Sequence, residues 1–159
     1  EERQGMYSVV MSLKMLYDKL FSPSHLYLKP VRLQDVISSV LQIYANEIQI
    51  SSLKIKTFFN FDERIFIDEI KMKKTLGFVI LYISDVVYKS TDVTISFAKE
   101  NGLIKISFAY KHALENDFEK YGVDLDTTYH YIESVINAHN GEIIFNKNHI
   151  ILTICATLN

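Results

Sequence analysis

The stretch that decides the fold is FIDEIKMKKTLGFVILYISDVVYKS, residues 66–90. It contains no proline, and its apolar side chains recur every three or four residues over about five turns, the spacing of one face of an α-helix. These side chains belong to Met72, Leu76, Val79, Ile80, Ile83, Val86 and Val87. The spacing predicts one long helix over residues 68–89, at the centre of the domain.

Extended segments are predicted on both sides of this helix. Residues 53–59 alternate and are rich in β-branched and aromatic side chains, and residues 64–67 form another short extended piece. Residues 93–97 and 103–108 alternate with period two and flank Asn101-Gly102, a dipeptide typical of tight hairpins. The pattern predicts two strands before the long helix and an antiparallel pair after it.

Two more helices and a last hairpin complete the predicted domain. Residues 33–47 have helical spacing, and a third core helix is expected to begin at Asp124 as its N-cap and to end at Asn140-Gly141. Residues 142–145 and 149–157 are expected to pair as the final hairpin. This order predicts a mixed α/β (α+β) fold, a two-layer sandwich in which helices cover one face of a mixed sheet of about five strands.

A separate amphipathic helix is predicted ahead of the domain, over residues 6–20. Its apolar stripe is close to a heptad seam, which packs against another helix. The stripe consists of Met6, Val9, Val10, Leu13, Leu16, Tyr17 and Leu20. Two interpretations remain open, a homodimer interface or a helix that folds back on its own domain. Pro23 ends the helix, so residues 1–24 are predicted to be helix and linker, and residues 25–159 the domain.

Bulk properties exclude several classes of protein. A net charge of −2 and a pI near 6.2 give no field that attracts a phosphate backbone, so no nucleic-acid partner is predicted. The lone Cys155 excludes an internal disulfide, and no apolar run approaches the roughly 20 residues of a membrane span. Since it has neither an initial Met nor a signal peptide, the chain is interpreted as a cytoplasmic piece of a longer protein, which could itself be attached to a membrane.

Three short segments carry a resemblance to a known family. They are Phe66-Ile67-Asp68, residues 85–90 and Ala138-His139-Asn140-Gly141-Glu142-Ile143. They resemble the ATP-binding catalytic domain of sensor histidine kinases, a member of the GHKL ATPase superfamily with the Bergerat fold. The family's last segment usually reads histidine followed by two glycines, and here Asn140 replaces the first glycine. The resemblance covers residues 27–158 and implies two-component signalling and a parallel dimer built on the preceding helix.

The nucleotide-binding motifs of that family are replaced in this chain. The family's asparagine that ligates Mg²⁺ falls on Tyr82 when the long helix is aligned by its start, and on Asp85 when it is aligned by its end. Asp85 could ligate Mg²⁺ through its carboxylate. The family's adenine-binding aspartate falls in Ala109-Tyr110-Lys111-His112, so that Tyr110 and His112 stand in its place. The resemblance therefore implies that the adenine anchor is lost.

The family's phosphate-binding glycines fall just before the third core helix. This chain has Asp124 and Asp126 there, and their carboxylates would repel a triphosphate where the family offers backbone amides at a helix N-terminus. Only five glycines occur in the whole chain, too few to build a phosphate cradle as well as the turns. We therefore predict no cofactor and no catalytic residue, the alternative being Mg-ATP bound through Asp85.

The leading hypothesis is a degenerate, non-catalytic histidine-kinase-like domain, a pseudokinase, that acts through dimerisation or through binding a response regulator or another kinase. The first alternative is an active but divergent sensor histidine kinase, so that enzymatic activity is left open. The second is an interaction domain unrelated to signalling. The clustered Lys71, Lys73 and Lys74 are interpreted as a solvated helix face, and the five scattered histidines as structural.

Overall fold

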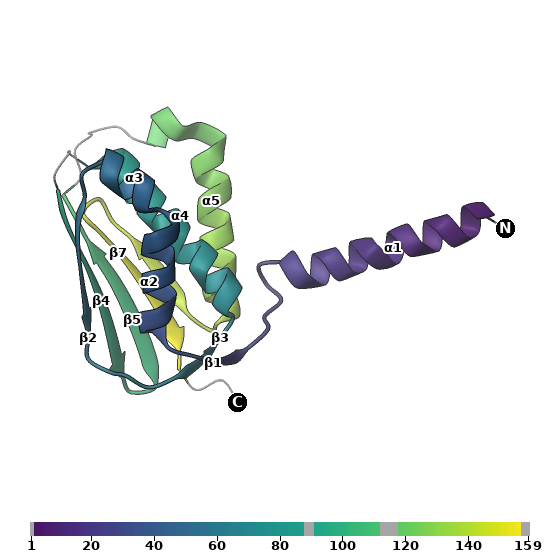
Figure 1. Cartoon of the computed structure of the whole chain (residues 1–159), viewed down its shortest axis with the longest axis horizontal. Helices are drawn as coiled ribbons and strands as arrows, with labels where there is room; N and C mark the ends of the chain where they lie inside the picture. Colours follow the sequence, from purple (N-terminus) through teal and green to yellow (C-terminus); the bar gives the residue numbers. More distant parts are fainter. Residues whose placement is uncertain (1, 88–90, 112–117, 157–159) are drawn as a thin grey trace.

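The computed structural model describes the backbone of residues 2–87, 91–111 and 118–156, and the side chains of the same residues apart from 2–3, 17–21 and 118–126. Figure 1 shows an α/β domain from which the helix α1 (Glu2–Phe21) projects. The predicted two-layer α+β fold with a separate N-terminal helix is confirmed.

The long helix α4 (Glu69–Val86) lies between the other two main helices of the domain, as expected for a central helix. Asp68 caps its N-terminus, because its Oδ1 accepts a hydrogen bond from the Lys71 N–H at 3.0 Å. The cap provides a partner for one of the N–H groups that the first turn of a helix leaves unbonded. The predicted apolar face is buried, with at most 1% exposure at Met72, Leu76, Val79, Ile80, Ile83 and Val86.

In the described part of the chain the main sheet has five strands, in the order β2 (Lys54–Phe59), β4 (Asp92–Glu100), β5 (Leu103–Ala109), β7 (His149–Cys155) and β6 (Glu142–Phe145). β2 runs parallel to β4 and the other neighbours are antiparallel, so the sheet is mixed as predicted. A small separate sheet pairs β1 (Lys29–Val31) with β3 (Ile65–Ile67) in antiparallel orientation.

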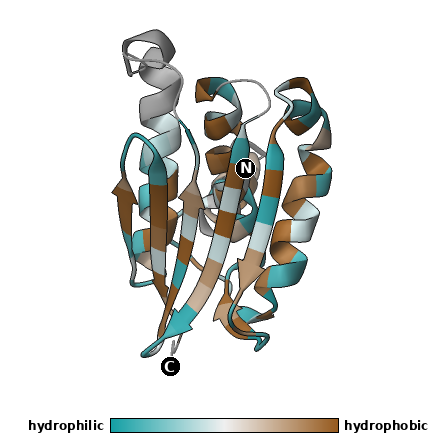
Figure 2. Ribbon diagram, turned by 90° about the vertical axis from the view of Figure 1, so that its left-hand side faces the viewer, coloured by the Kyte–Doolittle hydropathy of each residue, from teal (hydrophilic) through white to brown (hydrophobic). Residues whose placement is uncertain are grey.

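One face of the main sheet is covered by α2 (Leu33–Ile43), α4 and α5 (Phe118–Ala138) (Figure 1). Figure 2 looks onto the opposite face, over which no described helix lies. Successive side chains of a strand point to opposite faces of the sheet. In β4, for example, Val93, Ile95 and Phe97 are buried toward the helices, and the residues between them are partly exposed. The core is the apolar layer between sheet and helices.

The helix predicted over residues 33–47 is in fact two helices, α2 and α3 (Ala45–Ile50), separated at Tyr44. The ring of Tyr44 lies against α4 at Gly77, where a Cβ would come within 2.4 Å of the ring carbon Cε2. Gly77 therefore leaves the space that the Tyr44 ring fills. Neither glycine nor proline occurs at the break, so the sequence pattern contains no signal of it.

α5 begins earlier than predicted. It starts at Phe118, and Asp124 lies inside it, so the prediction that Asp124 caps this helix is wrong. Gly122 also lies within the helix. An isolated glycine costs a helix about 1 kcal/mol relative to alanine. This cost, together with the polar residues that precede Gly122, is why the sequence pattern favours a loop there.

Candidate functional site

Tyr82, one of the two positions that align with the family's Mg²⁺-binding asparagine, lies in the core. It is on α4, is 9% exposed, and its ring packs edge-on against Phe145 of β6, with 5.0 Å between the ring centroids. Phe145 also meets the ring of Tyr129 on α5, at 5.8 Å. These aromatic contacts join α4, α5 and the edge of the sheet, so the ring of Tyr82 contributes packing at this position.

Asp85, the other candidate Mg²⁺ ligand, is exposed near the end of α4. Partial burial raises the pKa of its carboxyl above the ordinary value. Among the residues that the structure describes, no group of three or more His, Cys, Asp and Glu side chains could hold a metal ion together. A single carboxylate binds Mg²⁺ together with water and substrate phosphates, so a metal at Asp85 would require a bound nucleotide.

Tyr110, which stands in the region of the family's adenine-binding aspartate, is also buried, with 6% exposure. It directly follows β5. Its backbone N–H donates to the Asn148 carbonyl at 3.0 Å, and its hydroxyl donates to the Asn146 carbonyl at 3.5 Å. Both acceptors lie in the turn between β6 and β7, so Tyr110 ties the end of β5 to the neighbouring hairpin. The side chains of His112, Asp124 and Asp126 are not among those that the structure describes.

A buried polar cluster lies at the other end of α4. Asp68 and Lys71 are each 4% exposed, and the Lys71 Nζ lies 3.3 Å from the Asp68 Oδ2. The backbone N–H of Asp68 donates to the His139 Nε2 at 3.1 Å, and the His139 Nδ1 lies 2.8 Å from the Val135 carbonyl oxygen. The two contacts assign a neutral imidazole with its proton on Nδ1. We call Asp68, Lys71 and His139 the Asp68 cluster.

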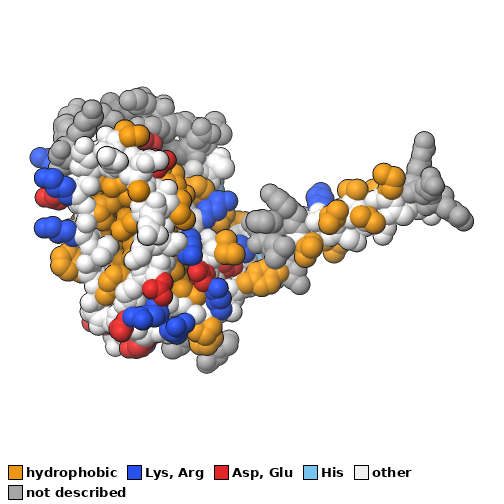
Figure 3. All heavy atoms as spheres, viewed as in Figure 1, with side chains coloured by type: hydrophobic (Ala, Val, Ile, Leu, Met, Phe, Trp, Pro, Cys, Tyr) orange, Lys and Arg blue, Asp and Glu red, His pale blue; other side chains and the backbone are white. Residues whose placement is uncertain are grey.

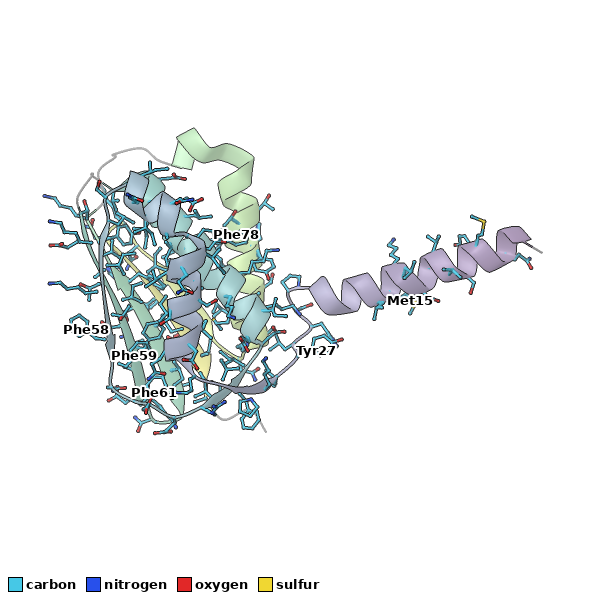
Figure 4. The ribbon with its side chains drawn as sticks, viewed as in Figure 1. Met15, Tyr27, Phe58, Phe59, Phe61 and Phe78 are labelled. Carbon is cyan, nitrogen blue, oxygen red and sulfur yellow. The ribbon has the colours of Figure 1, made fainter. Side chains whose placement is uncertain are left out.

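The Asp68 cluster also holds residues 22–28, the linker between α1 and the domain. The Tyr27 N–H donates to the Asp68 Oδ2 at 2.9 Å, and the Lys71 ammonium donates to the His25 carbonyl oxygen. The same ammonium lies 5.7 Å from the centre of the Tyr27 ring, within the range of a cation–π contact. Figure 4 shows Tyr27 where the linker meets the domain. The linker is thus bound through backbone groups, an ammonium and a ring.

The prediction of a solvated lysine face at the start of α4 is wrong for Lys71. Lys73 forms an ion pair with Glu69 at 3.0 Å, and Lys74 lies over the ring of Tyr131 at 4.5 Å, but Lys71 is buried. Sequence reasoning missed the pair that Lys71 makes. Its signal is the acidic residue three positions earlier, at the spacing that brings helix neighbours together.

Gly141, next to the Asp68 cluster in the chain, allows a close backbone contact. A Cβ at this position would lie 1.7 Å from the Thr153 carbonyl oxygen of β7, so a larger residue would force the strand to move. Asn140 has a φ of 55°, in the left-handed region that glycine and asparagine adopt most readily. Asn140 therefore occupies a backbone conformation that glycine also adopts readily.

The apolar stripe of α1 is exposed along its described length (Figure 3). Its described members are between 52% and 71% exposed, namely Met6, Val9, Val10, Leu13 and Leu16. The side chains of Tyr17 and Leu20 lie outside the described residues. Because α1 projects from the domain, the interpretation in which it folds back on its own domain is not seen in this structure (Figure 1).

Several solved structures of histidine kinases share this architecture. AdeS of Acinetobacter baumannii matches with a TM-score of 0.72 at 12% identity, over 98% of this chain and 84% of that chain. The nucleotide-free catalytic domain of ThkA matches with a TM-score of 0.70 at 12% identity, over 84% of this chain and all of that domain. The chain has the fold of a histidine kinase catalytic domain. ThkA in complex with the response regulator TrrA also matches, with a TM-score of 0.65 at 16% identity, over 98% of this chain and 48% of that one.

Neither a protein-family model nor a curated protein sequence matches the chain. Within the histidine kinase fold, two of the three segments that carry the resemblance meet in space, since residues 66–68 supply Asp68 and residues 138–143 supply His139. Two segments that lie far apart in the sequence are therefore joined by a buried hydrogen bond.

The pH dependence of stability tests the assigned state of His139. Burial lowers the pKa of His139, against the opposing effects of the Val135 carbonyl and of the Asp68 charge. Below the ordinary pKa of about 6.5 the unfolded chain therefore takes up a proton that the folded chain resists. We expect the free energy of unfolding, measured with denaturant, to fall as the pH falls from about 6.5 toward 5.5.

A His139→Gln variant should lose most of this slope. The matched control, His149→Gln at an exposed position of β7, should keep it. A wild-type slope in His139→Gln would contradict a neutral, buried His139.

Proposed function

We propose that this chain is a degenerate histidine-kinase-like domain of a two-component signalling protein, and that it is non-catalytic. The observation that carries the proposal is the combination of the histidine kinase fold with buried tyrosines, Tyr82 and Tyr110, at positions that align with nucleotide-binding residues. In this proposal the domain acts by binding other proteins, and it transfers no phosphoryl group.

The chemistry of the replacements supports this proposal. Mg²⁺ prefers carboxylate, carbonyl and water oxygen, whereas Tyr82 offers an aromatic ring that is packed against Phe145. The adenine amino group needs an acceptor such as a carboxylate. The Tyr110 hydroxyl is instead directed at the Asn146 carbonyl, and it acts as a donor there. Two of the contacts that hold Mg-ATP in the family therefore have no equivalent at these tyrosines.

We propose two partners for this domain, one from the exposed stripe of α1 and one from the fold. A homodimer through α1 would cover apolar side chains that this structure leaves in solvent. A response regulator is the second partner that we propose, since ThkA, which shares the fold, has been solved in complex with one.

Among the described residues, no helix is both long and apolar enough to cross a bilayer. We place the domain in the cytoplasm on the strength of the signalling proposal.

Nucleotide binding is the property that decides between a pseudokinase and an active kinase. Mg-ATP at about 1 mM should leave the melting temperature unchanged, because a ligand stabilises a protein only when it binds the folded state. Mg²⁺ alone and ATP alone serve as controls. A Mg²⁺-dependent binding heat in calorimetry that Asp85→Ala abolishes would contradict the proposal and favour the alternative, an active and divergent histidine kinase that binds Mg-ATP.

The dimer can be tested on the stripe itself. Leu13→Glu places a charge in the middle of the proposed seam, where it would have to be buried without a partner. Light scattering should then report a monomer for Leu13→Glu and a dimer for the wild type. The control is Ser8→Glu, which adds the same charge on the far side of α1 and should remain dimeric. A dimer of unchanged stability in Leu13→Glu would refute the assignment.

A further inference from the structure

The outer edge of the main sheet is open along β2. Strand β2 ends the strand order, and its only described neighbour in the sheet is β4. The Lys54 N–H donates to the Thr91 carbonyl at 3.0 Å, and the Asn60 N–H donates to the Phe97 carbonyl at 3.1 Å, both on the β4 side. Because successive backbone groups of a strand point to opposite sides, the residues at odd positions direct N–H and C=O outward. These are Ile55, Thr57 and Phe59.

An apolar groove begins next to this open edge. It has a volume of about 500 Å³ and lies between the start of β2 and the segment formed by the end of α2 and by α3. Its apolar lining comes from Leu41, Ala45, Ile48, Leu53 and Ile55. Thr57 pairs with the buried Ile95 and so points to the helical side of the sheet, yet it is exposed. The helical layer therefore leaves the edge of β2 uncovered.

On its opposite face β2 itself carries two lysines and no acidic residue. Lys54 and Lys56 are exposed, and among the described residues neither of them forms an ion pair. Phe58, on the same face, is 57% exposed, whereas Phe59 stacks on Phe97 in the core (Figure 4). Edge lysines discourage a strand from pairing with a copy of itself, because like charges would then face each other. An acidic partner strand would meet no such repulsion.

We propose that β2 accepts an extended segment of a partner protein, in which apolar side chains alternate with acidic ones. The segment adds a strand to the sheet by bonding to the outward N–H and C=O groups of Ile55, Thr57 and Phe59. Its apolar side chains point toward the groove beside α3, and its carboxylates lie along Lys54 and Lys56. The proposal depends neither on nucleotide binding nor on the dimer through α1.

Amide hydrogen exchange in the full chain, followed by NMR, tests the strand addition residue by residue. The probe is a short capped peptide in which glutamate alternates with valine, and the matched control peptide has lysine in place of glutamate. With the acidic peptide, exchange at Ile55, Thr57 and Phe59 should slow by about tenfold or more, because these N–H groups acquire acceptors. Exchange at Lys54 and Lys56, whose N–H groups face β4, should change much less.

Two variants make the result specific. Lys54→Glu combined with Lys56→Glu should reverse the preference, so that the lysine peptide protects and the acidic one does not. Thr57→Pro removes a donor that β4 does not use and should abolish protection by the acidic peptide. The charge reversal involves exposed side chains only, so it remains informative if the proline variant fails to fold. No protection at the three outward amides, equal protection by both peptides, or protection confined to α1 would overturn the proposal.

Discussion

The carboxylate of Asp68 is the constraint on which the rest of the domain depends. It caps α4, pairs with the buried Lys71 and binds the backbone of the linker, while its own N–H is held by His139. Taking a carboxylate and an ammonium out of water is costly, and the pair is tolerated because each charge has several hydrogen-bond partners. The start of α4, the end of α5 and the approach to α1 are therefore fixed by one group of interactions.

The Asp68 cluster and the candidate nucleotide positions lie in different parts of the domain. Two of the segments that carry the sequence resemblance meet at the N-terminal end of α4, in the Asp68 cluster. Toward the other end of α4 and after β5 lie Tyr82, Asp85 and Tyr110, the residues that the sequence resemblance aligns with the family's nucleotide ligands. Packing at Tyr82 and the hydrogen bonds of Tyr110 stabilise the domain without any ligand. Under the proposed function, the chain keeps the framework of the fold and replaces its binding chemistry.

Apolar periodicity predicts most of the fold because the main helices and strands of the domain bury one face or one stripe. Periodicity does not predict features that depend on a contact between two particular side chains or on one residue within a helix. The sequence pattern does not predict that the Tyr44 ring fills the space above Gly77, where the predicted helix is divided. Nor does it predict that α5 continues through Gly122. Lys71 shows the same limit, because a lysine near an acid is usually solvated and only the fold shows that this pair is buried. At the positions that the resemblance aligns with nucleotide ligands, the sequence predicts replacements, and the structure shows that Tyr82 and Tyr110 are buried.

The most direct test of the central role of the Asp68 cluster is a comparison of Lys71→Met with Lys73→Met. Removing one partner of a buried ion pair costs roughly 3–5 kcal/mol, whereas a partly exposed pair such as Lys73–Glu69 contributes less than about 1 kcal/mol. The measurement is the free energy of unfolding together with amide exchange at Tyr27. Lys71→Met should lose several times more stability than Lys73→Met and should expose the Tyr27 amide to exchange. Equal stability of the two variants, with Tyr27 protected in both, would contradict the account.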